Sequence, residues 1–184
     1  AQKYGFTLVS IPVTPPGANQ QAEWTKVRRE KPDWVILRGF GIMNPTALMF
    51  AQRFGFARER IVGVWWAGAE EDVITAGEAA KGYIAASLNP AGDGFPVIRQ
   101  IRERLYQAGT GNMSDPARIG SVYYNRGLVH GVLNVEAIRV AQTKFGPRPL
   151  TGEEVRWGLE HLNLTTERLK ELGVEGLMPP MKTS

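Results

Sequence analysis

The first 88 residues alternate short β-rich runs with helical stretches, and this alternation most constrains the fold of the chain. Four runs have the composition of strands, at residues 7–13, 34–41, 60–66 and 82–88. Helical periodicity fills the intervals between them, at residues 19–31, 44–54 and 72–80. Strands that alternate with helices build a parallel sheet covered by helices. The sequence therefore predicts an α/β fold for this part of the chain.

Local signals set the limits of several of these elements. The run 34–41 is apolar almost throughout, as in a strand that is buried on both faces. Asn44 and Pro45 form an N-cap and first-turn pair for the helix that follows. Gly55 is placed to cap the other end of that helix. We therefore expect a helix that starts at Asn44 and Pro45 and runs through about Phe54.

The character of the chain changes near residue 90. From Phe95 onward the sequence is almost entirely helical, with a long helix opened by Asp115 and Pro116. A later helix begins at Thr151, which forms a capping box with Glu154 three residues on. No strand is visible that would complete a second sheet. The apolar faces of these helices must therefore pack on one another or on polypeptide outside this chain.

Charge and composition exclude several classes of protein. The net charge is +4, and the basic residues are interleaved with acids, as on solvated helix faces, so no nucleic-acid partner is expected. The chain has no cysteine, which excludes thiolate catalysis, iron–sulfur clusters and disulfides. The longest apolar run is too short to span a bilayer.

The familiar motifs of catalysis and cofactor binding do not occur in the sequence. It has no nucleotide-binding glycine loop and no Gly-x-Ser-x-Gly. The two histidines, His130 and His161, each lack a second histidine at metal-binding spacing. Adjacent acids such as Glu153 and Glu154 are typical complements of a helix dipole. We therefore expect neither an enzyme nor a bound metal or cofactor.

Two predicted strands end in residues suited to binding a ligand. In open parallel sheets, ligands bind outside the carboxyl ends of the strands. The second strand ends in Arg38, Phe40 and Gly41, and the third ends in Trp65 and Trp66. Arg38 offers a planar set of donors for a carboxylate, and the aromatic rings offer rigid apolar area. The alternative, which stays open for either tryptophan, is that its ring seals the sheet against the helices.

Several stretches of the chain resemble one family of proteins. Three of them are "AQKYGFTLVSIPVTPPGANQQAEWTKVRREKPDWVILRGFG", "ALMFAQRFGFARERIVGVWWAG" and "AAKGYIAASLNP". These are similar to the second lobe of type I periplasmic substrate-binding proteins, in the branched-chain amino acid receptor group of ABC importers. The later stretches "SVYYNRGLVHGVLNVEAIRVAQ" and "LTGEEVRWGLEHL" resemble helices of the family's first lobe.

The resemblance implies two α/β lobes joined by a hinge, with a small ligand held between them. Residues 1–88 would form part of the ligand-binding lobe II. Residues 89–172 would be a mainly helical segment packed on lobe I, and residues 173–184 a crossover or tail. Most of the first lobe is missing, so we interpret the chain as a fragment or a processed chain. The remainder of the same polypeptide, or a swapped copy, would complete it.

The resemblance also implies a function. A member of this family would be the extracytoplasmic solute-binding component of an ABC importer, periplasmic or lipid-anchored, with the importer's membrane subunits as partners. Trp65 aligns where amino-acid binders tend to carry an acid for the ligand's ammonium group. This exchange favours an aromatic or hydrophobic ligand, including an aromatic carboxylate paired with Arg38. Two alternatives stay open: a ligand-sensing regulatory domain of the same fold, and a doubly wound enzyme whose catalytic residues lie outside this fragment.

Overall fold

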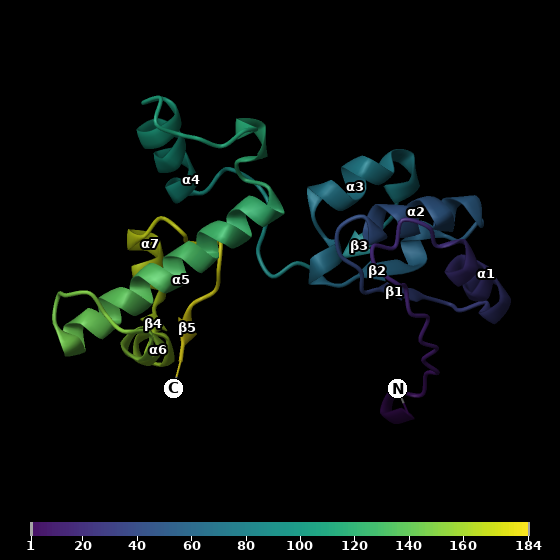
Figure 1. The fold of residues 1–184 in the computed structure, drawn as a ribbon, viewed down its shortest axis with the longest axis horizontal. Helices are drawn as coiled ribbons and strands as arrows, with labels where there is room; N and C mark the ends of the chain where they lie inside the picture. The colour runs from purple at the N-terminus through teal and green to yellow at the C-terminus, as the bar shows by residue number, and fades with distance from the viewer. Residues whose placement is uncertain (1, 184) are drawn as a thin grey trace. The chain divides into compact units, whose positions relative to one another are not determined.

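The computed structural model of the protein describes residues 2–183. The chain divides into two compact units, Ala1–Ser87 and Leu88–Ser184 (Figure 1). None of the helices within residues 2–183 combines the length and the hydropathy that crossing a bilayer requires. The assignment of residues 1–88 to a lobe II, of 89–172 to helices that cover lobe I, and of 173–184 to a crossover or tail stays a prediction.

The first unit is built around a three-stranded parallel sheet. Its strands are β1 (Val35–Leu37), β2 (Ile61–Gly63) and β3 (Ile84–Ala85), which lie side by side in chain order. Helix α2 (Met43–Arg53) connects β1 to β2, and α3 (Glu70–Ala76) connects β2 to β3, while α1 (Gln21–Glu30) precedes the sheet. The 3-10 helices are η1 (Gln2–Tyr4), η2 (Arg58–Arg60), η3 (Trp65–Ala67) and η4 (Gly77–Ala80). The predicted α/β fold with a parallel sheet flanked by helices is thereby confirmed.

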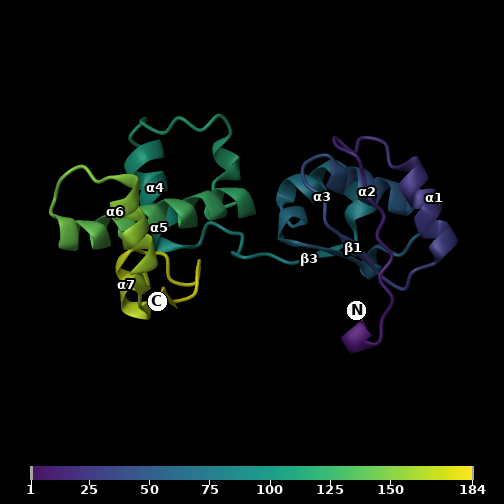
Figure 2. The same cartoon turned by 60° about the horizontal axis from the view of Figure 1, so that its bottom comes forward.

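The helices of the first unit pack on one face of this sheet. Trp24 of α1, Leu48 of α2 and Ile61 of β2 share one core cluster, and each is almost fully buried. In both views α2 and α3 lie on the same side of the strands (Figures 1 and 2). Right-handed crossovers that run in the same direction along a sheet place their helices on one face. Each large apolar side chain buried there stabilises the unit by about 1.5 to 3 kcal/mol.

The other face of the sheet carries an apolar row that is exposed to solvent. The ladder aligns Ile36 of β1 with Val62 of β2, and Val62 with Ile84 of β3. Ile36 is 63% exposed and Ile84 is 54% exposed. The prediction that 34–41 is a strand buried on both faces is therefore wrong, because both crossovers cover only the opposite face. We call Ile36, Val62 and Ile84 the outer row.

All four predicted strands differ from the structure in extent: 34–41 is reduced to Val35–Leu37, and 82–88 to Ile84–Ala85. Residues 7–13, predicted as a strand, have no strand assignment, although Ile11 packs against the core of the first unit. The predicted strand 60–66 ends at Gly63, and the two tryptophans that follow form part of η3. A strand needs a paired neighbour for its backbone hydrogen bonds, and composition alone does not reveal whether one is present.

The second unit is mostly helical and contains one small antiparallel ladder. Its helices are α4 (Pro96–Ile101), the π-helical turn η5 (Arg102–Tyr106), the 3-10 turn η6 (Pro116–Arg118), α5 (Val122–Phe145), α6 (Gly152–Glu160) and α7 (Thr166–Glu171). Strands β4 (Asn163–Leu164) and β5 (Met181–Lys182) pair antiparallel, a ladder that the sequence did not indicate. Helix α6 packs across α5 (Figure 2).

Capping side chains explain where the helices of the second unit begin. Ser121 accepts a hydrogen bond from the backbone N–H of Tyr124 and so starts α5. Asp115 caps only the short turn η6, so the prediction that it opens the long helix is wrong. The capping box at Thr151 is confirmed: its Oγ1 accepts from the backbone N–H of Glu154 at 3.3 Å, and its own N–H donates to the Glu154 carboxylate at 2.8 Å.

Candidate functional site

The predicted site residues lie in two loops at the carboxyl-terminal edge of the sheet. Arg38, Phe40 and Gly41 follow β1, and Trp65 and Trp66 follow β2. Because β1 and β2 are parallel neighbours, the loops after them leave the sheet at the same edge. The topology therefore brings both groups of residues to the position at which parallel α/β proteins hold ligands.

The loop after β1 presents its side chains to solvent. Phe40 is 57% exposed, and Arg38 is also exposed. The Arg38 guanidinium has no hydrogen-bond or ion-pair partner within residues 2–183. Gly41 has a φ of +55°, and the carbonyl groups of Phe40 and Gly41 accept the backbone N–H groups of Met43 and Asn44. The loop thus leads directly into α2, and it leaves the Arg38 guanidinium and the Phe40 ring available to a ligand.

The two tryptophans lie in the 3-10 turn η3, which we call the double-tryptophan turn. Their ring centroids are 4.6 Å apart, with 58° between the planes. Trp66 is 41% exposed, and Trp65 is half-buried. In a strand, neighbouring side chains point to opposite faces, whereas in this turn the two rings touch each other. The turn therefore presents a joined pair of indoles beside the loop of Phe40.

Asn44 connects the two loops, and its role was not predicted. It was expected to cap α2, but the N-cap is Ile42, and the Asn44 side chain is fully buried. Its Nδ2 donates to the Trp66 carbonyl at 3.2 Å and to Asp72 Oδ1 at 2.8 Å. Gly39 makes room for this amide, because a Cβ at position 39 would overlap Asn44 Oδ1. In the sequence, this role could have been suggested only by the position of Asn44 shortly after the glycines that follow the strand.

Two further side chains hold the double-tryptophan turn. The buried Asp72 of α3 accepts the backbone N–H of Ala69 at 3.0 Å through Oδ2. The Tyr83 hydroxyl donates to the Ala67 carbonyl at 2.6 Å. Burial raises the pKa of Tyr83 above its usual range, and the charge of Asp72 raises it further. The turn is therefore fixed at the Trp66 and Ala67 carbonyls, and the Ala69 N–H that Asp72 accepts is at the N-cap of α3, directly after the turn.

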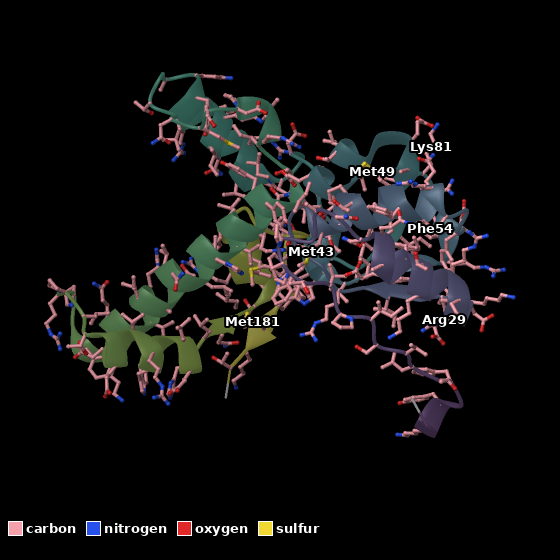
Figure 3. The ribbon with its side chains drawn as sticks, turned by 45° about the vertical axis from the view of Figure 1, so that its right-hand side comes forward. Arg29, Met43, Met49, Phe54, Lys81 and Met181 are labelled. Carbon is pink, nitrogen blue, oxygen red and sulfur yellow. The ribbon has the colours of Figure 1, made fainter. Side chains whose placement is uncertain are left out.

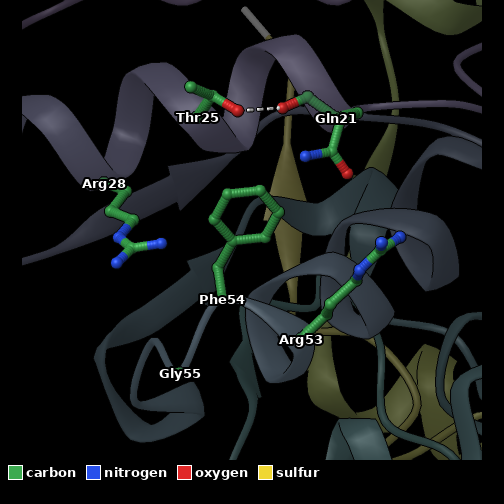
Figure 4. Close-up of a pocket in the computed structure, with 6 residues that line it drawn as sticks. All are labelled: Gln21, Thr25, Arg28, Arg53, Phe54 and Gly55. Carbon is green, nitrogen blue, oxygen red and sulfur yellow. Dashed lines mark hydrogen bonds between the residues drawn. The ribbon is translucent and has the colours of Figure 1, made fainter.

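An open pocket lies at the other end of α2, away from these loops. It has a volume of about 580 Å³ and is lined by Gln21, Thr25, Arg28, Arg53, Phe54 and Gly55. The Phe54 ring lies between the side chains of Arg28 and Arg53 (Figure 4). Because α2 begins at the carboxyl edge of the sheet and runs back, its last residues lie near the amino ends of the strands. This pocket contains none of the predicted site residues.

The two histidines and the methionines of α2 lie in ordinary packing or surface positions. His161 stacks on Trp157 with ring centroids 3.9 Å apart, and His130 is exposed on α5. Within residues 2–183, no group of three or more His, Asp or Glu side chains is arranged to hold a metal ion. Met43 at the start of α2 is buried, whereas Met49 of the same helix is 42% exposed (Figure 3).

Comparison with known proteins identifies the family. Residues 1–184 match the family described as periplasmic binding protein. A crystal structure described as an ABC transporter permease from the Pseudomonas fluorescens group is 49% identical to this chain, with a TM-score of 0.89. The alignment covers 100% of this chain and 44% of that chain. A comparison with curated protein sequences finds no match.

More distant structures share the fold. A branched chain amino acid ABC transporter from Thermus thermophilus with bound valine is 25% identical, with a TM-score of 0.61, over 78% of this chain and 36% of that chain. A fatty acid ABC transporter substrate-binding protein from Thermomonospora curvata is 18% identical, with a TM-score of 0.65, over 93% of this chain and 40% of that chain. The chain therefore spans less than half the length of these proteins. The resemblance seen in the sequence is confirmed, and the chain belongs to the periplasmic binding protein family.

Proposed function

We propose that the protein is the solute-binding component of an ABC importer. It binds a small carboxylate with an apolar or aromatic body at the edge of the sheet where β1 and β2 end. One observation carries this proposal: the unpaired Arg38 guanidinium, the exposed Phe40 ring and the paired indoles of Trp65 and Trp66 leave the same edge of the sheet. A guanidinium binds a carboxylate through two parallel hydrogen bonds, while aromatic rings bury the rest of the ligand.

The similar structures support this type of role. The Thermus thermophilus protein is described with bound valine, which has a carboxylate and a branched apolar side chain. The double-tryptophan turn offers a larger aromatic surface than an aliphatic side chain needs. We therefore place aromatic acids beside branched-chain and aromatic amino acids among the candidate ligands. An ammonium group would gain about 0.5 to 2 kcal/mol from an indole face by cation–π attraction.

The family membership also supports the proposed setting. Periplasmic binding proteins deliver their ligand to the membrane subunits of an importer, so the expected location is periplasmic or otherwise extracytoplasmic. The remainder of the same polypeptide, or a swapped copy, supplies the other wall of the site. We infer a binding protein and not an enzyme, because the similar structures are described as transport proteins.

A calorimetric titration of the full-length protein tests the proposal. Valine, phenylalanine and benzoate are titrated into the wild type, into Arg38→Gln and into the control Arg28→Gln. We expect at least one carboxylate to bind, and Arg38→Gln to weaken it by about 1.5 to 3 kcal/mol, as for a hydrogen bond to a charged group. Arg28 lies in the pocket at the far end of α2, so Arg28→Gln should bind as the wild type does. Equal affinity in all three proteins would remove Arg38 from the site.

A further inference from the structure

Two buried polar side chains join the loops that carry the candidate site. Asn44 in α2 is fully buried, and Asp72 in α3 is 2% exposed. They contact each other through the Asn44 Nδ2 to Asp72 Oδ1 hydrogen bond of 2.8 Å. Because the Trp66 carbonyl and the Asp72 carboxylate are both acceptors, the NH₂ end of the Asn44 amide must face them. The orientation of this amide is therefore determined by its partners.

We propose that Asn44 and Asp72 are positioning residues that set the double-tryptophan turn in the geometry that binds ligand. The inference rests on the proposed function, because it concerns the same site. Both side chains are buried, so we assign neither of them a direct contact with the ligand. Asn44 acts on the Trp66 carbonyl, and Asp72 acts on the Ala69 N–H. Their effect on binding therefore passes through the backbone of the turn and of the adjoining start of α3.

The pair does more than contribute to general stability. The Trp66 carbonyl accepts from the buried Asn44 amide, while the Trp66 indole is 41% exposed, so this contact holds the backbone of a residue whose ring is open to solvent. A buried carboxylate is costly unless hydrogen bonds compensate it, and Asp72 accepts one from each of Asn44 and Ala69. Removing the amide leaves two buried acceptors short of a donor. The turn is then expected to rearrange so that water reaches them, and the indole pair moves with it.

The chain offers a matched control for this effect. Tyr83 donates to the Ala67 carbonyl, so Tyr83→Phe also removes one hydrogen bond to the same turn. The loss of this bond leaves the hydrogen bonds of Asn44 to the Trp66 carbonyl and to Asp72 in place. A variant that lowers stability alone should therefore resemble Tyr83→Phe. A positioning variant should in addition change the indole pair and the ligand affinity.

The experiment compares Asn44→Ala, Asp72→Asn and Tyr83→Phe in the full-length protein. The isosteric Asp72→Asn can still accept the hydrogen bond from Asn44, but its NH₂ group then faces the Ala69 N–H, so that hydrogen bond is lost. This variant tests the same role if Asn44→Ala does not fold. Three quantities are measured: the melting temperature, the exciton couplet of the neighbouring indoles in circular dichroism without ligand, and the Kd for benzoate by calorimetry.

The positioning role predicts a weaker couplet and about a tenfold higher Kd in the Asn44 and Asp72 variants, the size expected for one lost hydrogen bond. Tyr83→Phe should lower the melting temperature and keep both the couplet and the Kd. A couplet and Kd that stay at the wild-type values in Asn44→Ala and Asp72→Asn would overturn the inference. If the wild type binds none of the carboxylates tested, the proposed function fails, while the couplet still decides whether the pair positions the turn.

Discussion

Gly158 of α6 lies directly against the backbone of Ala137 in α5. A Cβ at position 158 would overlap the Ala137 carbonyl oxygen, and it would stand 3.1 Å from the side chain of Ala141 one turn further along. Gly158, Ala137 and Ala141 are all buried. The close packing of α5 and α6 therefore depends on the absence of a side chain at this point, because backbone atoms cannot give way as a flexible side chain does.

We predict that Gly158→Ala destabilises the protein although alanine is the better helix former. Overpacking against the Ala137 backbone should lower the free energy of unfolding by about 1 to 3 kcal/mol. The matched control is Gly131→Ala in α5, where a Cβ meets nothing within 4 Å. That change should raise the free energy of unfolding by up to about 1 kcal/mol. Urea denaturation followed by far-ultraviolet circular dichroism measures both, and a stabilising Gly158→Ala would contradict the packing described.

The ion pair between Glu136 and Arg168 supports a second prediction. Arg168 of α7 donates to both carboxylate oxygens of Glu136 in α5, at 2.7 and 2.8 Å, and the Glu136 side chain is only 7% exposed. Removing the guanidinium leaves the buried carboxylate with the longer ion pair to Arg139, whose Nε lies 3.5 Å from Glu136 Oε1. Because Arg168 itself is partly exposed, we expect Arg168→Met to lower the free energy of unfolding by about 2 to 3 kcal/mol.

The same ion pair distinguishes geometry from charge. Arg168→Lys keeps the charge but cannot form the bidentate pair of hydrogen bonds to Glu136. Its free energy of unfolding should therefore lie between those of the wild type and Arg168→Met. The double variant Glu136→Gln with Arg168→Met should recover part of the lost stability, since no unpaired buried carboxylate remains and Glu171, the other partner of Arg168, is exposed. Chemical denaturation of the wild type, Arg168→Lys, Arg168→Met, Glu136→Gln and the double variant measures these differences. Additive losses in the double variant would argue against a direct interaction.

Acid should weaken the start of α6. Hydrogen bonds from Arg148 and from the Thr151 backbone lower the pKa of Glu154 to about 2. A carboxylate whose pKa is lower in the folded state stabilises that state above its unfolded pKa of about 4.3 and loses this effect as pH falls. The contribution of the capping box should therefore decline between about pH 4.5 and pH 2. Thermal unfolding of wild type and Glu154→Gln across this range checks it, because the gap between them should close as the pH falls.

The aromatic residues of the candidate site should respond to ligand. Phe40→Ala and Trp65→Ala are each expected to weaken carboxylate binding by about 2 to 3 kcal/mol, as for buried aromatic anchors. Intrinsic tryptophan emission of the full-length protein should change when the ligand binds. Phe56→Ala, in the core of the first unit against Trp24, serves as a control that affects stability and not the site. Unchanged affinity in both site variants would remove these rings from the site.

The sequence predicted the architecture better than the connections within it. Alternating strands and helices were enough to predict the parallel sheet, and the Thr151 capping box is a local signal that the structure confirms. Asn44 was misread because an Asn-Pro pair at a helix start has the same composition whether the amide caps its own helix or reaches another loop. Only the approach of α3, which brings Asp72 to within hydrogen-bonding distance, decides between the two.

The two tryptophans show the same limit. The predicted strand 60–66 ended in Trp65 and Trp66 and so continued through both residues, but β2 ends at Gly63. A Cβ at Gly63 would overlap the Tyr83 hydroxyl, which holds the Ala67 carbonyl of the following turn. The turn is thus imposed by a residue 20 positions away in the sequence from Gly63. Contacts of that kind leave no periodic trace in the sequence around the tryptophans.

The outer row of Ile36, Val62 and Ile84 affects how this piece of chain behaves in the laboratory. An exposed apolar surface such as the outer row binds amphiphilic dyes and adsorbs to plastic while the protein is still folded. Dye-based melting curves of residues 1–184 would then start from a high fluorescence baseline, and a ligand's effect would be masked by the dye already bound. Label-free readouts, such as indole emission or calorimetry, avoid that background, and a mild non-ionic detergent should limit losses during purification.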